Sequence, residues 1–400
     1  MLKLSSEAAK AVKIGSLCSL AYLAVYVARN ILGSVSPQMI EDGIFTEAQI
    51  GTLSSVYFIS YAIGQLINGI IGDKVKAKYM ISIGLVLAGI TNALFALFAG
   101  QQPASTVTYA VTGFALAMIY APMTKVVAEN TDPKYTHRCS LGYTLASFLG
   151  SPAAGLLAAA MVWNMVFGSS SALLILMGTV FFITFSSMER KGLIEYGKYD
   201  KPAQAGGSIS LLIRHRIIRF TCVAMLTGVV RTTVVFWLPT FISQYLGFSP
   251  KQSALIYTVS TLIISSAAFI AIFTYERLGR KLFSALLLFF SCSACSFLLV
   301  YLIDLPFLCI AFMVLGIISA NCASTMLWSI YCPSLRETGK VSGATGFLDF
   351  SSYMAAAASS SLFSNAVADI GWGPLILVWF GLMLLGVLVA LPFPKRKNIA

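Results

Sequence analysis

Four charged residues interrupt long apolar stretches of the chain: Arg29, Lys125, Arg231 and Asp349. Placing a charge in apolar surroundings is costly, so such residues usually serve binding or charge pairing. An arginine stays protonated and presents a planar fork of donors that matches phosphate or carboxylate bidentately. The two arginines together therefore predict a site for an anion, with phosphate as the best geometric match.

Polar and aromatic residues accompany the first arginine. Tyr22 and Tyr26 lie seven and three residues before Arg29, which puts all three on one face of a helix. Tyr61 and Gln65 occupy a second apolar stretch at similar helical spacing. These four residues are candidate substrate contacts; the alternative is that they pack in the core or against lipid.

Each of these four charged residues also has a structural interpretation. Arg29 or Arg231 could pair with a neighbouring carboxylate, and Asp349 could be that carboxylate or a titrating proton carrier. Lys125 closes its apolar stretch, so its ammonium could instead reach the membrane surface.

The composition indicates which elements must hold these residues. The 400-residue chain is 58% hydrophobic and only 10% charged, whereas soluble domains carry about 25% charged residues. A spanning helix needs about 20 mainly apolar residues, and only helices or closed barrels satisfy the backbone in lipid. The sequence lacks the ten-residue alternation of barrel strands. Twelve spans are predicted: 14–34, 51–71, 79–99, 105–127, 140–160, 163–187, 217–242, 253–274, 282–303, 306–330, 341–366 and 373–393.

The net charge of +12 follows membrane topology rather than nucleic-acid binding. With the N-terminus in the cytoplasm, the 27 Lys and Arg fall in or beside the tails and cytoplasmic loops, apart from Arg29, Lys125, Arg231 and Lys251. This positive-inside pattern predicts an inner-membrane protein with both termini cytoplasmic. Its basic ends would also attract anionic membrane lipids.

The chain repeats itself. Arg231 follows Arg29 by 202 residues, and Glu276 follows Asp73 by 203. The expected organisation is a six-helix half at 1–187, a polar cytoplasmic linker at 188–215 and a second six-helix half at 216–400. Parallel halves of this kind hold substrate between them near the middle of the membrane.

Two loops carry a recognisable pattern. Gly69–Lys78 (GIIGDKVKAK) and its weaker copy Tyr275–Lys281 (YERLGRK) resemble the signature loops of the major facilitator superfamily. The resemblance implies an all-α membrane fold of twelve helices in two pseudo-symmetric halves. It also implies that Asp73, Arg138, Glu276 and Lys340 act in gating or topology rather than in substrate contact.

A narrower resemblance is to the organophosphate:phosphate antiporter family. It rests on Tyr22, Tyr26 and Arg29, on Arg231 followed by Trp237-Leu-Pro239-Thr240, and on the stretch Ser342–Gly373 around Asp349. The chain departs from the glycerol-phosphate members, which have Lys, His and Glu where this sequence has Gln65, about Ser147 and about Ser260.

The resemblance implies a monomeric secondary transporter that exchanges a phosphorylated organic anion for inorganic phosphate. Two alternatives stay open: a proton-coupled carrier of another organic anion that uses Asp349, and an organophosphate sensor of the same fold. No enzyme is expected, since the sequence has neither a P-loop nor H-E-x-x-H. No cofactor or metal is expected either, and Cys292-x-x-Cys295 is interpreted as helix packing.

Overall fold

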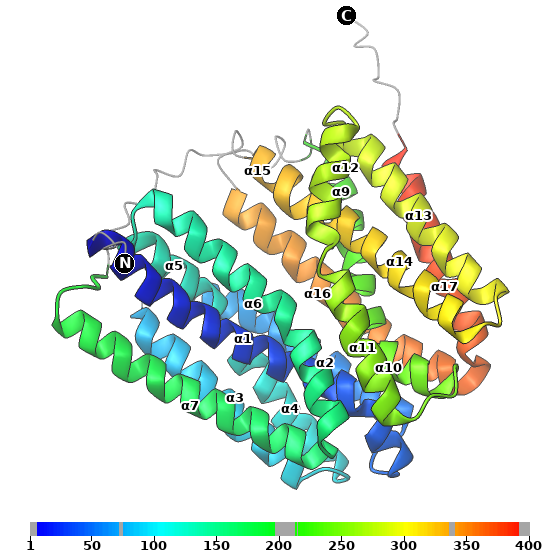
Figure 1. The fold of residues 1–400 in the computed structure, drawn as a ribbon, viewed down its shortest axis with the longest axis horizontal. Helices are drawn as coiled ribbons and strands as arrows, with labels where there is room; N and C mark the ends of the chain where they lie inside the picture. Colours follow the sequence, from blue (N-terminus) through cyan, green and yellow to red (C-terminus); the bar gives the residue numbers. More distant parts are fainter. Residues whose placement is uncertain (1–5, 72–74, 197–212, 214, 336–340, 392–400) are drawn as a thin grey trace, which may run out of the picture. The chain divides into compact units, whose positions relative to one another are not determined.

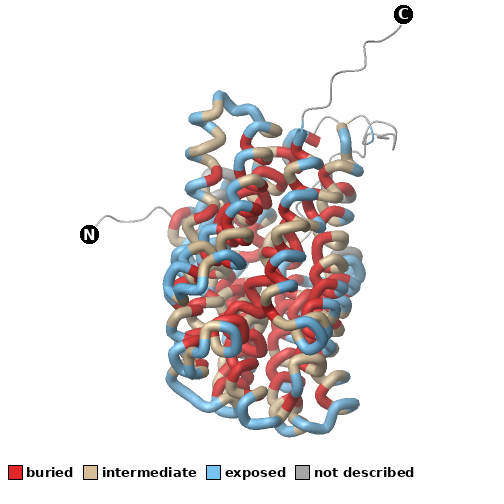
Figure 2. The backbone as a smooth tube through the Cα atoms, turned by 90° about the vertical axis from the view of Figure 1, so that its right-hand side faces the viewer, coloured by how far each residue is buried: buried red, intermediate tan, exposed pale blue. Residues whose placement is uncertain are grey.

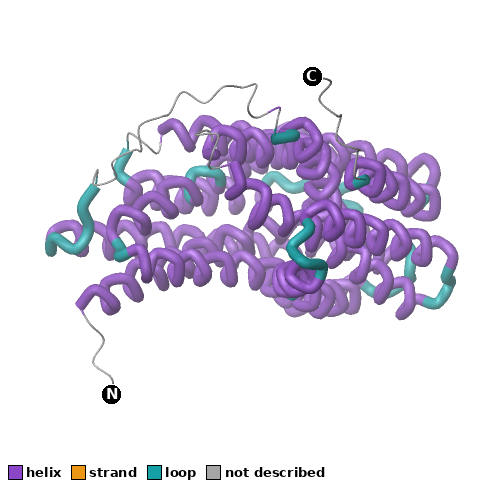
Figure 3. Tube along the Cα trace, turned by 90° about the horizontal axis from the view of Figure 1, so that it is seen from above, coloured by secondary structure: helices purple, strands orange, loops and turns teal. Residues whose placement is uncertain are grey.

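The computed structural model describes residues 6–71, 75–196, 213, 215–335 and 341–391. This described part consists of helices and loops, without a strand (Figure 3). The helices are α1 (Ser6–Glu41), α2 (Glu47–Ile71), α3 (Ala77–Leu97), α4 (Gln102–Leu116), α5 (Tyr120–Asn130), α6 (Pro133–Ala160), α7 (Trp163–Arg190), α9 (Ile217–Gly228), η1 (Val229–Val234), α10 (Val235–Gln244), α11 (Pro250–Ile264), α12 (Ala267–Arg277), α13 (Leu282–Leu302), α14 (Pro306–Thr325), η2 (Met326–Tyr331), α15 (Cys332–Ser334), α16 (Val341–Ile370) and α17 (Trp372–Ala390).

Within the described residues, eleven helices are long and apolar enough to cross a membrane. The 30-residue α16, rich in serine and alanine, matches the remaining predicted span. The all-α membrane fold class is therefore confirmed.

Individual spans differ from the prediction in length and continuity. α1 runs from Ser6 to Glu41 rather than over 14–34, because a helix continues into the polar region beyond the apolar stretch that hydropathy detects. The predicted span 105–127 breaks between α4 and α5. α7 continues to Arg190, so the first residues of the predicted linker are helical.

The described chain forms two compact units, and unit 1 comprises residues 1–203, 236–262 and 357–368. Here α1 packs against α6 and α7, α3 against α7, and α4 against α2 and α3 (Figure 1). Buried residues recur along the helices, and many loop residues are exposed (Figure 2). The predicted halves, which rest on the sequence repeat, stay a prediction.

Unit 1 also contains a row of hydroxyl contacts between early and late parts of the chain. Ser36 and Thr240 hydroxyls lie 2.8 Å apart, and those of Ser54 and Ser360 lie 2.5 Å apart. All four residues are buried. We call these four residues the hydroxyl seam. Close approach is possible because Gly33 lacks a side chain: a Cβ there would lie 2.9 Å from the Phe236 carbonyl oxygen.

Unit 2 comprises residues 204–235, 263–356 and 369–400. In this unit α13 packs against α14 and α17, and α9 packs against the same two helices. α16 approaches the end of α9 very closely, because a Cβ at Gly228 would lie 2.2 Å from the Ser352 hydroxyl oxygen. This contact positions the segment that follows Gly228, which carries Arg231.

Candidate functional site

Arg29 lies on α1 among aromatic rings of unit 1. Its guanidinium carbon lies 5.1 Å from the ring centroid of Tyr61, 5.4 Å from that of Tyr26 and 6.0 Å from that of Phe58. These distances are in the range in which a ring face attracts a cation. Tyr61 is 2% exposed, so this contact is largely shielded from solvent.

Tyr22, which lies one helical turn before Tyr26, packs in a cluster of four tyrosines. Its ring centroid lies 4.9 Å from Tyr26, 5.5 Å from Tyr120 and 6.1 Å from Tyr143. Tyr22 and Tyr143 are buried. Tyr26 therefore belongs to both groups: it contacts Arg29 on one side and the tyrosine cluster on the other.

Arg231 lies in unit 2, in the π-helical turn η1. Its guanidinium carbon lies 6.0 Å from the ring centroid of Tyr353 on α16. The neighbouring Thr233 hydroxyl donates a hydrogen bond of 2.9 Å to the Ala356 carbonyl oxygen, which ties the turn to α16. π-helical turns inside α-helices occur frequently at functional sites.

The Arg231 guanidinium is not neutralised within the described chain. Its Nη2 atom is buried and has no hydrogen-bond partner there, and Arg231 makes no ion pair with a described carboxylate. The structural alternative considered for this residue, pairing with a carboxylate such as Asp349, is thus not what the structure shows. Leaving a buried charged donor unsatisfied is costly, which points to a role outside protein stability.

The remaining candidate contacts are half-buried. Lys125 lies on α5 and Gln65 lies on α2, four residues after Tyr61. Asp349 lies on α16, four residues and hence about one turn before Tyr353. Lys125 and Asp349 each take part in interactions within the structure.

The predicted gating residues have different positions. Arg138 is exposed and its guanidinium carbon lies 5.8 Å from the Tyr135 ring centroid. Glu276 is exposed near the end of α12. Asp73 and Lys340 lie outside the described residues, so their gating role stays a prediction.

Sequence reasoning missed the charge cluster beside the signature loop. Glu189 at the end of α7 accepts hydrogen bonds from Lys76, at 2.6 Å, and from Lys78. The hydrogen bond that Lys76 donates to the Glu189 carboxylate raises the pKa of Lys76. No sequence pattern indicates this pairing, because Glu189 lies far along the chain and falls in the predicted linker 188–215. Phe58 and Tyr353 were also missed, although each is one helical turn from a predicted site residue.

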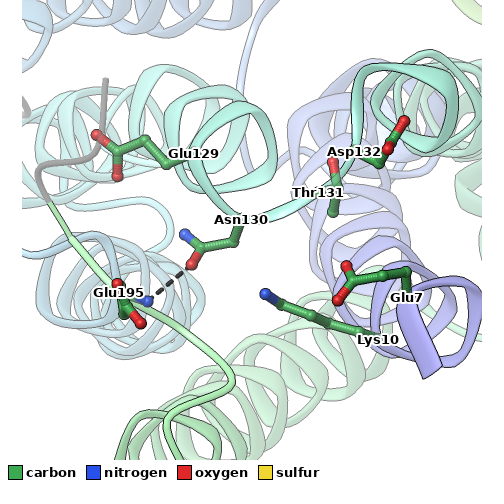
Figure 4. Close-up of a pocket in the computed structure, with 7 residues that line it drawn as sticks. All are labelled: Glu7, Lys10, Glu129, Asn130, Thr131, Asp132 and Glu195. Atoms are coloured by element: carbon green, nitrogen blue, oxygen red, sulfur yellow. Dashed lines mark hydrogen bonds between the residues drawn. The ribbon is translucent and has the colours of Figure 1, made fainter. Parts of the chain in front are cut away.

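A pocket of about 330 Å³ opens in unit 1 away from these aromatic residues (Figure 4). Its lining is Glu7, Lys10, Glu129, Asn130, Thr131, Asp132 and Glu195. The backbone N–H of Glu195 donates to the Asn130 side-chain oxygen at 2.7 Å. None of the candidate substrate residues lines this pocket, and its excess of carboxylates disfavours an anionic ligand.

Comparison with known proteins gives a consistent family. The Major Facilitator Superfamily profile matches residues 18–350. Membrane sensor protein UhpC of Salmonella typhimurium is 33% identical over 76 residues, which are 19% of this chain and 17% of that protein. The Bacillus subtilis hexuronate transporter is 20% identical over 67% of this chain and 66% of its own length. The glycerol-3-phosphate transporter of the same organism is 21% identical over 58% and 57%.

The fold also has solved counterparts. The crystal structure of a D-xylose-proton symporter superposes with a TM-score of 0.72 and 16% identity, covering 98% of this chain and 99% of that one. At this identity the similarity establishes the fold and nothing about the substrate.

Proposed function

The chain belongs to the Major Facilitator Superfamily, and from that premise we propose that it exchanges a phosphorylated organic anion for inorganic phosphate by alternating access. Arg29 and Arg231 each hold part of one anionic group. A dianionic phosphate has enough oxygens for both forks. The proposal places this multi-pass protein in the inner membrane as a monomer, with both termini cytoplasmic.

The observation that carries the proposal is the buried Nη2 atom of Arg231 without a hydrogen-bond partner in the described chain. A charged donor in that state gains much more from an anionic acceptor than a donor already bonded to protein. A phosphate oxygen would supply the missing acceptor. The glycerol-3-phosphate transporter relative supports phosphate as the anion.

The surroundings of Arg29 support the same chemistry. Aromatic faces stabilise a cation without cancelling its charge, so Arg29 keeps its attraction for an anion. Arg29 and Arg231 are like charges, so with no anion bound their repulsion would oppose closure around an empty site. Closure only with a bound anion is what obligatory exchange requires.

Counterflow in proteoliposomes preloaded with inorganic phosphate tests the proposal. Labelled phosphate should enter in exchange, and sugar phosphates or triose phosphates outside should compete, whereas non-phosphorylated anions should not. Arg29→Gln and Arg231→Gln should each abolish exchange. Lys251→Gln removes the same charge from an exposed residue and should leave it intact. Exchange that persists in both arginine variants would refute the proposal.

A second candidate is a proton-coupled carrier of a carboxylate. The hexuronate transporter relative favours it, since that match extends over the larger share of the chain, and Asp349 is half-buried in α16. This candidate predicts uptake driven by a pH gradient without phosphate inside the vesicles. It also predicts that Asp349→Asn uncouples uptake while the arginine variants have smaller effects.

A third candidate is a sensor, favoured by the match to a membrane sensor protein. A sensor would bind the phosphorylated ligand without moving it. The purified protein would then bind the phosphorylated ligand. Cells that have this protein but no other transporter for the ligand would not grow with the ligand as their sole phosphorus source.

A further inference from the structure

Two arginines in unit 2 share one aromatic ring. The guanidinium carbon of Arg219 lies 4.2 Å from the ring centroid of Phe283, and that of Arg216 lies 5.2 Å from it. Phe283 itself packs against Phe220, with ring centroids 5.9 Å apart. Two guanidinium groups beside one ring concentrate positive potential at the start of α9 and α13, because the fields of like charges add.

The two arginines are used differently. Arg219 donates through Nε to the Val389 carbonyl and through Nη2 to the Leu391 carbonyl at the end of α17. Arg216 is exposed and makes no ion pair within the described chain. Arg219 therefore holds helices together, while the fork of Arg216 is available to a ligand.

The backbone at this place is strained. Arg216 has φ 62° and Arg280 has φ 59°, and they are the two non-glycine residues with positive φ in the described chain. Strained residues of this kind cluster at functional sites. Lys281, which follows Arg280, is exposed and also makes no ion pair with a described carboxylate. Glu276 near the end of α12 is exposed and forms no ion pair with a described Lys or Arg either.

These cations lie where apolar helices begin, which is where lipid headgroups meet a spanning protein. Ile213 and Ile218 beside Arg216 are 55% and 67% exposed, so apolar surface adjoins the charge. Arg231 lies 15 residues after Arg216, or roughly 22 Å along a helix at 1.5 Å per residue. The cluster is thus separate from the candidate substrate site.

We propose that Arg216 and Lys281, beside Phe283, bind the phosphate of an anionic phospholipid whose acyl chains lie on Ile213 and Ile218. Phosphate matches the guanidinium fork, and the exposed isoleucines select a lipid over a free anion. The headgroup would neutralise charge that the described protein leaves unpaired.

The test uses full-length protein delipidated in detergent, with thermal unfolding followed as lipid is added. Phosphatidylglycerol should raise Tm and phosphatidylcholine should not. In the double variant Arg216→Gln/Lys281→Gln, about 30-fold more phosphatidylglycerol should be needed, since each basic residue contributes roughly fivefold. The control Lys13→Gln/Arg190→Gln removes the same charge from exposed residues of unit 1 and should behave as the wild type. Equal loss in both double variants would overturn the proposal in favour of diffuse surface charge.

Two further arms separate the remaining explanations. Inorganic phosphate should neither reproduce the Tm rise nor displace phosphatidylglycerol; if it does both through Arg216 and Lys281, the site takes a free anion and the lipid proposal is wrong. Arg216→Gly relieves the left-handed backbone, so Tm without lipid should stay equal or rise while the lipid requirement increases. A fall in Tm with unchanged lipid dependence would assign Arg216 a purely structural role and contradict the proposal.

Discussion

Arg29 and Arg231 occupy corresponding places in the sequence repeat, yet their surroundings differ. Arg29 lies on a continuous α-helix with three aromatic rings within 6.0 Å. Arg231 lies in a π-helical turn with one ring at 6.0 Å and a buried donor that no described residue accepts. The protein stabilises the first cation through its aromatic rings, whereas the proposed anion would supply the acceptor that the second one lacks.

The difference teaches how a repeated sequence position can acquire unequal roles. Aromatic contacts favour the charge but impose no direction on its hydrogen bonds. An unsatisfied guanidinium donor demands an acceptor with defined geometry. We therefore expect Arg29 to supply attraction and Arg231 to supply most of the discrimination between phosphate and other anions.

The largest expected effect is on phosphate binding when each arginine is replaced by lysine, which keeps the charge. Arg231→Lys should weaken inorganic phosphate binding by about 10–100-fold, because charge-assisted hydrogen bonds of the fork are worth about 1.5–3 kcal/mol. Arg29→Lys should weaken it by less than about tenfold, since an ammonium also interacts with ring faces. Calorimetric titration of each variant measures this, and equal losses would remove the proposed asymmetry.

The aromatic contacts give the next effect. Tyr61→Leu should weaken phosphate binding by roughly 3–30-fold, because a desolvated cation–ring contact is worth about 0.5–2 kcal/mol. Tyr61→Phe keeps the ring and should stay within about twofold. Tyr353→Leu should have a smaller effect than Tyr61→Leu, since its ring lies farther from its arginine. The reverse order of the two leucine variants would contradict the comparison.

Substitution of Asp349 tests whether this carboxylate takes part in transport. Asp349→Asn should change phosphate counterflow by less than about twofold at pH 6 and at pH 8, since Arg231 forms no ion pair with it. Counterflow at the two pH values measures this. Loss of a pH-driven uptake in this variant, with phosphate binding intact, would instead favour the proton-coupled candidate.

The last expected effect concerns the signature loop and changes the balance of conformations rather than phosphate binding. We expect the Asp73 carboxylate to lie near the N-terminal end of the predicted span 341–366 in one open state. Asp73→Asn should then shift the equilibrium between open states by about 0.3–1 kcal/mol, or roughly 2–5-fold, since an exposed carboxylate at a helix N-terminus is worth that amount. Spin-label distances between the two predicted halves measure the populations. Asp42→Asn, at an exposed residue after α1, is the matched control. Phosphate affinity should be unchanged in both variants.

The apolar stretches of the sequence predicted the spanning helices well, because the hydropathy of a span is set by local composition. They missed the π-helical turn at Arg231, since widening one turn of an apolar helix leaves its composition unchanged. They also missed Glu189, whose partners Lys76 and Lys78 are brought to it by the packing of α3 on α7. Tyr353 was within reach of sequence reasoning, because it lies one helical turn from Asp349.

The hydroxyl seam of unit 1 has a consequence for populations. Neutral hydrogen bonds contribute only about 0.5–1.5 kcal/mol each, because water replaces the lost partner when they separate. The two pairs, Ser36 with Thr240 and Ser54 with Ser360, thus contribute about 1–3 kcal/mol. Reversing a 1:99 equilibrium takes about 5.5 kcal/mol. If these pairs separate during the proposed transport cycle, contacts this weak would leave the conformational balance within reach of a single bound anion.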